Sequence, residues 1–203
     1  MADLMALTGI APRLVAVAAV TAKPSPTMWY LTRALAVAAY VTLTISIVMG
    51  MLRTIARRSG ERLTWIVDEL HQFLALLSGV LVAGHLITLT LDPFLPFSYI
   101  NLFLPVNEPY RPLAVTLGVF AFYAMAALLF SSWLRRRMSY QFWRVLHYIS
   151  FIAFALVTAH GLLAGSDARE TWMAALYAAG AAGVGFLVLL RFFGSSPKSA
   201  KQA

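Results

Sequence analysis

Four histidines are the residues of this chain whose type and spacing could carry chemistry: His71, His85, His147 and His160. His71 and His85 are 14 residues apart, and His147 and His160 are 13 residues apart. Each pair lies within one long apolar stretch, where a helix rising about 1.5 Å per residue would separate the two rings by roughly 20 Å. Ionisable side chains at membrane depth are costly and by default mark function. The histidines are therefore the candidate site.

The stretches that hold the histidines belong to a chain too apolar for a water-soluble domain. Of its 203 residues, 61% are hydrophobic and 12% are charged, whereas soluble domains have about 45–50% apolar and about 25% charged residues. Several apolar runs reach the roughly 20 residues needed to cross a bilayer core. The sequence predicts an all-α integral membrane helical bundle of five transmembrane helices. The predicted spans cover residues 28–52, 64–91, 112–133, 140–163 and 171–193.

Two segments flank this bundle, which forms one predicted domain over residues 28–193. In the N-terminal segment 1–27, the apolar part 4–22 is interrupted by a proline and an arginine. It would be an interfacial helix, a degenerate first helix that raises the count to six, or, least favoured because it lacks a basic start, a signal peptide. The Ser/Lys-rich tail 194–203 is expected to be disordered and cytoplasmic.

Basic residues indicate the orientation, because cytoplasmic loops of membrane proteins carry an excess of Lys and Arg. Eleven basic residues fall on one side of the predicted spans: Arg53, Arg57, Arg58, Arg62, Arg135, Arg136, Arg137, Arg144, Arg191, Lys198 and Lys201. Five fall on the other: Arg13, Lys23, Arg33, Arg111 and Arg169. We therefore expect the first side and the C-terminus to be cytoplasmic. The net charge of +8 then reflects loops that contact membrane lipid, and no nucleic acid partner is expected.

The depths of the histidines follow from the order of the spans. The second and fourth spans run in the same direction, since one span separates them. His71 and His147 each lie seven residues past the cytoplasmic start of their span, and His85 and His160 lie near the outer end. The histidines thus form two level pairs, His71 with His147 and His85 with His160. Neutral imidazole binds iron well and haem is a large apolar disc, so we expect two b-type haems, each between two axial histidines.

Other interpretations of the histidines are weaker. A zinc or di-iron site would gather its ligands at one depth, often with carboxylates. A proton relay would need interleaved carboxylates, which the interior of these spans lacks, and packing histidines would have no reason to occupy two matched depths. The chain contains no cysteine, which excludes thiolate-bound iron–sulfur clusters, covalent c-type haem and disulfides.

The fourth span presents a geometric difficulty. At about 100° per residue, 14 residues return the second histidine to within about 40° of the first, but 13 residues leave it about 140° away. Either this helix bends or bulges between His147 and His160, or its two haems lie on different sides of it.

Two arginines are candidate cofactor-binding residues. Arg144 precedes His147 by three residues, so it lies on the same helix flank and could pair with a propionate of the inner haem. An anchor at the cytoplasmic face is the equal alternative for Arg144. Arg33 lies inside the first span near its outer end and could pair with a propionate of the outer haem, ahead of Arg111 in the outer loop.

These features resemble the ferric reductase-like transmembrane domain family. That family includes the membrane part of NADPH oxidases and ferric reductases, and the haem-bearing subunit of bacterial periplasmic methionine sulfoxide reductase systems. The resemblance rests on the two histidine pairs and covers residues 28–193. Short strings also look like bacterial members: Trp29-Tyr30-Leu31-Thr32-Arg33, Leu91-Asp92-Pro93-Phe94, Trp143-Arg144-Val145-Leu146-His147-Tyr148 and His160-Gly161. It implies that the four histidines are haem ligands and that the protein lies in a bacterial inner (plasma) membrane. The family core usually has six helices, so this chain departs from it in residues 4–22.

No nucleotide-binding motif is present, because Gly180, Gly183 and Gly185 follow no strand and are better explained by close helix packing. We therefore expect the membrane electron-transfer component of an oxidoreductase, and not a self-contained oxidase. Electrons would come from a separate cytoplasmic flavoprotein or from quinol, with flavin or quinone supplied by that partner. They would leave to ferric iron, oxygen or a partner reductase outside. The alternatives are a quinone-linked cytochrome b subunit of a respiratory complex and a cofactor-free membrane transporter or structural protein.

Overall fold

Helices account for almost all of the chain that the computed structural model describes, which is residues 26–59, 64–93, 97–106 and 110–193. The elements are α2 (Thr27–Ser59), α3 (Thr64–Thr90), α4 (Tyr99–Phe103), α5 (Pro112–Trp133), the 3₁₀ turn η1 (Leu134–Arg137), α6 (Tyr140–His147), α7 (Ile149–Ala164) and α8 (Thr171–Phe193). Five candidate membrane spans result, one of which comprises α6 and α7. The predicted all-α bundle of five spans is confirmed. The predictions for residues 4–22 and 194–203 lie outside the described residues.

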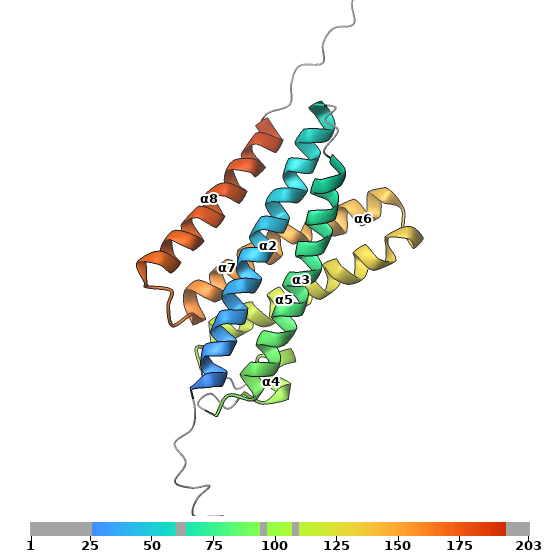
Figure 1. The fold of residues 1–203 in the computed structure, drawn as a ribbon. Coiled ribbons are helices and arrows are strands. Elements are labelled where there is room, and N and C mark those ends of the chain that lie inside the picture. The colour runs from blue at the N-terminus through green and yellow to red at the C-terminus, as the bar shows by residue number, and fades with distance from the viewer. Residues whose placement is uncertain (1–25, 60–63, 94–96, 107–109, 194–203) are drawn as a thin grey trace, which may run out of the picture.

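Two pairs of helices make the body of the bundle (Figure 1). α2 and α3 lie side by side, and α5 lies along α7 in the same way. α8 packs on the flank of α2 that is turned away from α3. The two pairs cross at an angle and contact each other through α3 with α5 and α2 with α7. The helices that carry the histidines therefore belong to different pairs and meet where the pairs cross.

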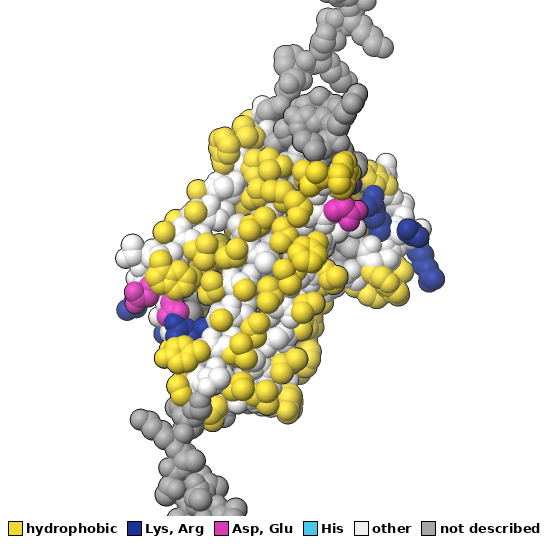
Figure 2. Space-filling view, viewed as in Figure 1, with side chains coloured by type: hydrophobic (Ala, Val, Ile, Leu, Met, Phe, Trp, Pro, Cys, Tyr) yellow, Lys and Arg dark blue, Asp and Glu magenta, His cyan; other side chains and the backbone are white. Residues whose placement is uncertain are grey.

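The surface of the bundle suits lipid rather than water. Apolar side chains cover the middle of the face seen in Figure 2, and charged side chains gather toward its two ends. On α3, the side chains of Phe73, Leu76, Val80 and Ile87 are 59–63% exposed. Their spacing places them on one face of the helix, which is the stripe that a soluble protein would bury. In a membrane this stripe faces the hydrocarbon, where its exposure carries no penalty.

One glycine allows α8 to pack closely on α2. A Cβ at Gly180 would lie 2.7 Å from the hydroxyl oxygen of Tyr40, whose side chain is buried. Close packing is therefore confirmed at Gly180. At Gly183 and Gly185 a Cβ would meet no atom of the described residues within 4 Å, so close packing there stays a prediction. At about 100° per residue, these two positions are turned about 60° and about 140° away from Gly180.

The fourth predicted span is interrupted at Tyr148, directly after the first of its histidines. α6 ends at His147, and α7 begins at Ile149. The N–H of Tyr148 donates to the carbonyl of Val145 at 3.1 Å, and the N–H of Phe151 donates to that of Tyr148 at 3.1 Å. Bonds over three residues wind the chain more tightly than an α-helix. Of the two alternatives, an irregular helix between His147 and His160 is therefore the one observed, and the rotation of about 100° per residue does not apply across the irregularity.

The loop between α3 and α5 is described over residues 91–93, 97–106 and 110–111. It contains α4, which the sequence did not predict, and Ser98 caps that helix by accepting from the N–H of Ile100 at 3.2 Å. At its far end, Tyr110 donates its hydroxyl to the carbonyl of Ala164, and Arg111 donates to that of Leu163 at 2.5 Å. These are terminal carbonyls of α7, which lack helical partners. The loop thus ties the beginning of α5 to the end of α7.

Candidate cofactor site

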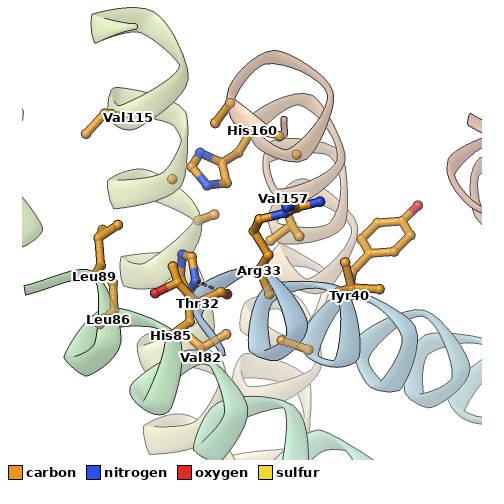
Figure 3. Close-up of a pocket in the computed structure, with 18 of the residues that line it drawn as sticks. Thr32, Arg33, Tyr40, Val82, His85, Leu86, Leu89, Val115, Val157 and His160 are labelled. Carbon is orange, nitrogen blue, oxygen red and sulfur yellow. Dashed lines mark hydrogen bonds between the residues drawn. The ribbon is translucent and has the colours of Figure 1, made fainter. Parts of the chain in front are cut away.

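His85 on α3 and His160 on α7 line the same cavity and point into it (Figure 3). Nδ1 of His85 lies 3.0 Å from the carbonyl oxygen of Thr32, and Nδ1 of His160 lies 2.7 Å from that of Ala114. Both acceptors are backbone atoms of neighbouring helices. The predicted outer pair is therefore brought together, and each ring is held by a helix other than its own.

The walls of this cavity are largely apolar. They include Val82, Leu86 and Leu89 of α3, together with Val115 of α5 and Val157 of α7. The charged residues on the walls are one arginine and two aspartates: Arg33, Asp92 and Asp167. A lining of this kind accommodates a large apolar group and places a few polar atoms at its edge.

The inner pair, His71 and His147, is also brought together. Their ring centroids are 6.0 Å apart, and the ring planes are inclined by 81°. Nδ1 of His71 lies 2.7 Å from the carbonyl oxygen of Ser46, whose hydroxyl donates to the carbonyl of His71 at 3.1 Å. The ring of His71 lies against α2 at Gly50, where a Cβ would approach its Cε1 to 3.0 Å. α2 therefore orients His71 as it orients His85.

His147 differs from the other three histidines. Its ring stacks on Trp143, one turn earlier in α6, with centroids 4.8 Å apart and planes inclined by 23°. Its Nδ1 is buried and has no hydrogen-bond partner within the described part of the chain, and the same holds for Nε1 of Trp143. Two orphaned buried polar atoms thus lie side by side at the inner level.

The two predicted arginines have different surroundings. Arg33 lines the outer cavity, forms an ion pair with Asp167, and lies over the ring of Trp29 at 4.0 Å from its centroid. Arg144 is exposed on α6 and makes no hydrogen bond or ion pair with any described residue. Arg111, the lesser alternative for the outer level, donates to a carbonyl at the end of α7.

The donor set of each level suits haem better than a bare metal ion. Among the described residues, no group of three or more His, Asp or Glu side chains is placed to hold a metal. Two imidazoles per level suit an iron whose other ligands come with the cofactor. The ring centres of His71 and His147 are 6.0 Å apart, so these two imidazoles are close enough for one cofactor to be held by both.

Several residues of the site were not predicted from the sequence. Gly118 lies beside His160, where a Cβ would approach Nδ1 to 2.7 Å, and Gly50 lies beside His71 in the corresponding way. Ser46 contacts His71 through both its carbonyl and its hydroxyl. The helix carrying each of these residues was predicted, but its rotation toward the histidine was not. A glycine in an apolar span is the only sequence signal that could have indicated a ring against the backbone.

Comparison with known proteins identifies the family. The family model described as "Ferric reductase like transmembrane component" matches residues 35–158, which is more than half of the chain and includes His71, His85 and His147. The search of curated proteins found no match, and neither did the search of solved structures. Members of the family typically bind haem, and its membrane domain implies transmembrane electron transfer. The resemblance drawn from the sequence is thereby confirmed, and the chain belongs to the ferric reductase-like transmembrane component family.

Proposed function

We propose that this chain is a di-haem b-type cytochrome that conducts electrons across a membrane. His71 and His147 would be the axial ligands at the inner level, and His85 and His160 those at the outer level. The 6.0 Å between the ring centres of the inner pair carries the proposal. The outer pair supports it, because its two rings share one cavity whose walls are mostly apolar.

The backbone acceptors define how the histidines would bind iron. A carbonyl oxygen can only accept a hydrogen bond, so Nδ1 of His71, His85 and His160 carries the proton. Nε2 would then keep its lone pair for the metal, and the hydrogen bond that Nδ1 donates would orient the ring. When bound, the two irons supply one-electron ferric–ferrous couples. The apolar lining of the outer cavity would keep water away from the metal.

Arg33 and Arg144 are proposed to pair with the haem propionates. Arg33 already forms an ion pair with Asp167, but a guanidinium carries five N–H donors and can serve a second carboxylate. Arg144 lies one helical turn from His147 and shares its donors with no described residue. The first arginine would serve the outer level and the second the inner level.

We further propose that the inner level faces the cytoplasm of a bacterial cell. The described arginines of the larger basic group lie toward the C-terminal ends of α2 and α8, in η1 and in α6: Arg53, Arg135, Arg136, Arg137, Arg144 and Arg191. In Figure 1 the C-terminal ends of α2 and α8 lie at the end of the bundle opposite α4. Such an excess of positive charge is typical of cytoplasmic ends. Electrons would enter at the His71/His147 level from a separate flavoprotein or from quinol. They would leave at the His85/His160 level to ferric iron, oxygen or a partner reductase outside.

The proposal is tested by the haem content and spectrum of the full chain, purified in detergent from haem-replete cells. Pyridine haemochrome analysis is expected to give two haems b per polypeptide, and the oxidised spectrum is expected to be that of six-coordinate low-spin iron. A protein isolated without haem would refute the function. A single haem per chain would refute the assignment of two levels.

A further inference from the structure

The two histidine pairs differ in the hydrogen bonding of Nδ1, the ring nitrogen that would not bind iron. At the outer level, Nδ1 of both His85 and His160 bonds to a backbone carbonyl. At the inner level, only Nδ1 of His71 does so, while Nδ1 of His147 is buried without a hydrogen-bond partner among the described residues. A hydrogen bond from the second nitrogen increases the basicity of an imidazole ligand. The outer pair is therefore the more strongly electron-donating of the two.

The charges around the two pairs also differ. Three arginines lie on the elements around this level: Arg53 of α2, Arg135 of η1 and Arg191 of α8. Arg53 is paired with Asp68, whereas Arg135 lies over the ring of Trp143, which itself stacks on His147. Arg191 lies near the ring of Tyr148. The surroundings of the inner pair are therefore net positive among the described residues.

The outer pair has no such cationic surroundings in the described part of the chain. The charged side chains on the wall of its cavity are Arg33, Asp92 and Asp167. The nearest cation on the cavity wall, Arg33, is neutralised by Asp167. Charge and hydrogen bonding thus distinguish the two levels independently of each other.

Given the proposed function, on which this step rests, we infer that the inner haem has the higher reduction potential of the two. Reduction adds an electron to the iron, so nearby positive charge favours the reduced state and raises the potential. A more basic ligand stabilises ferric iron and lowers the potential. The orphaned Nδ1 of His147 and the charge of Arg135 therefore raise the inner potential. The two hydrogen-bonded histidines lower the outer one.

This order of potentials gives the two levels different tasks. An electron that enters from the donor is held at the His71/His147 level, where the reduced state is favoured. The His85/His160 level is the stronger reductant and is the one that faces the acceptor. Arg135 and Trp143 are positioning residues in this scheme, because each acts on the iron through His147.

The test is potentiometry of the purified two-haem protein, followed by the visible absorbance of the reduced haems. Two reduction steps are expected. In Arg135→Gln, the higher-potential step should move to a lower potential, and the other step should stay in place. Arg136→Gln is the matched control, since it removes the same charge from the same 3₁₀ turn without the contact to Trp143. A shift confined to the lower-potential step, or an equal shift in the control, would overturn the inference.

A second pair of variants tests the hydrogen bond itself. Trp143→Gln places an amide oxygen one turn before His147, within reach of its Nδ1. Trp143→Leu leaves a comparable gap without an acceptor. The higher-potential step should lie at a lower potential in the glutamine variant than in the leucine variant, and equal potentials would contradict the role of the orphaned nitrogen.

Haem content separates a failure of the proposed function from a failure of the order of potentials. A haem-free protein would overturn the proposed function, whereas two haems with a single unresolved step would overturn only the order of potentials.

Discussion

At the scale of single residues, the histidines are positioned by backbone atoms and by glycines rather than by polar side chains. Carbonyls of Ser46, Thr32 and Ala114 accept from three of the four rings. Any residue supplies a carbonyl, so the acceptor places no demand on side-chain type. The constraint on residue type applies instead to Gly50 and Gly118, where any side chain would occupy the space of the imidazole.

Replacing each histidine by alanine is expected to produce effects that group by level. His85→Ala and His160→Ala should chiefly remove the outer haem, and His71→Ala and His147→Ala the inner one. Each variant also leaves a cavity and an unpaired partner histidine, so all four should lose some stability. Haem content and reduction from the cytoplasmic side check the grouping. If His71 behaves like His85 and His147 like His160, the assignment by level is wrong.

Gly118→Val is expected to reduce haem at the outer level only. The added Cβ would lie 2.7 Å from Nδ1 of His160, so the ring must turn and lose its bond to Ala114. The matched control is Gly185→Val, where the added Cβ meets nothing within 4 Å. Haemochrome analysis should give about half the haem of the parent in the first variant and an unchanged content in the second. Equal contents in both would contradict the role of Gly118.

At the scale of helices, α2 is the element that positions the site. It supplies the acceptors for His71 and His85 on α3, and it carries Arg33 and Tyr40. α7 supplies His160, and the interruption at Tyr148 allows α6 to direct His147 separately. α8 carries no histidine and instead packs against α2. It also contributes Met173 and Tyr177 to the wall of the cavity, so it both supports α2 and lines the site.

Gly180→Leu is expected to destabilise the bundle without removing a ligand. The new side chain would meet the hydroxyl of the buried Tyr40 within a packed interface, and overpacking of this kind typically costs about 1–3 kcal/mol. Gly183→Leu has open space at the same helix and serves as the control. Thermal unfolding in detergent, followed by loss of the haem absorbance, should begin at a lower temperature in Gly180→Leu alone. Coincident unfolding curves would show that α8 does not support α2 at this position.

At the scale of the whole molecule, the bundle has two unlike ends separated by an apolar band (Figure 2). One end carries Arg53, η1 and the start of α6, and the other carries α4 and the ion pair of Arg33 with Asp167. One histidine pair lies toward each end. This polarity is what a protein needs if it accepts electrons on one side of a membrane and releases them on the other.

The topology follows from the basic end. A reporter that is active only in the cytoplasm is expected to be active when fused to the C-terminus. A reporter that is active only outside the cytoplasm is expected to be active when inserted in the loop that contains α4. Positive charge retained in the cytoplasm is the physical reason. Removing the charges of η1 by a triple Arg→Gln replacement should weaken this preference. A C-terminal reporter active only outside the cytoplasm would reverse the orientation and exchange the inner and outer levels.

The source of electrons can be tested on the same scale. The described residues form helices only and offer no nucleotide fold, so NADPH alone is expected to leave the purified haems oxidised. Addition of a flavin reductase with NADPH, or of a reduced quinol, should reduce them. The initial rate of the absorbance change measures this. Rapid reduction by NADPH with no added protein would contradict a separate donor.

The sequence by itself determined the spans and the depths of the histidines. Hydrophobic length is a local property, and a helix rises by a constant amount per residue. The positions of His71, His85, His147 and His160 therefore followed from counting, and both predicted pairs lie together in the structure. The difficulty of the 13-residue spacing also came from counting, and one of its two explanations was an irregular helix, which the structure has at Tyr148.

Only the tertiary structure decided what surrounds each histidine. The carbonyl that receives each Nδ1, the glycine under each ring and the pairing of Arg33 with Asp167 all join residues of different helices. Such contacts depend on how far each helix is rotated about its axis and on the angle at which the pairs cross. In a span that is apolar all round, no periodic pattern in the sequence fixes that rotation. That Nδ1 of His147 has no hydrogen-bond partner among the described residues distinguishes the inner level from the outer, and this could therefore be found only in the folded chain.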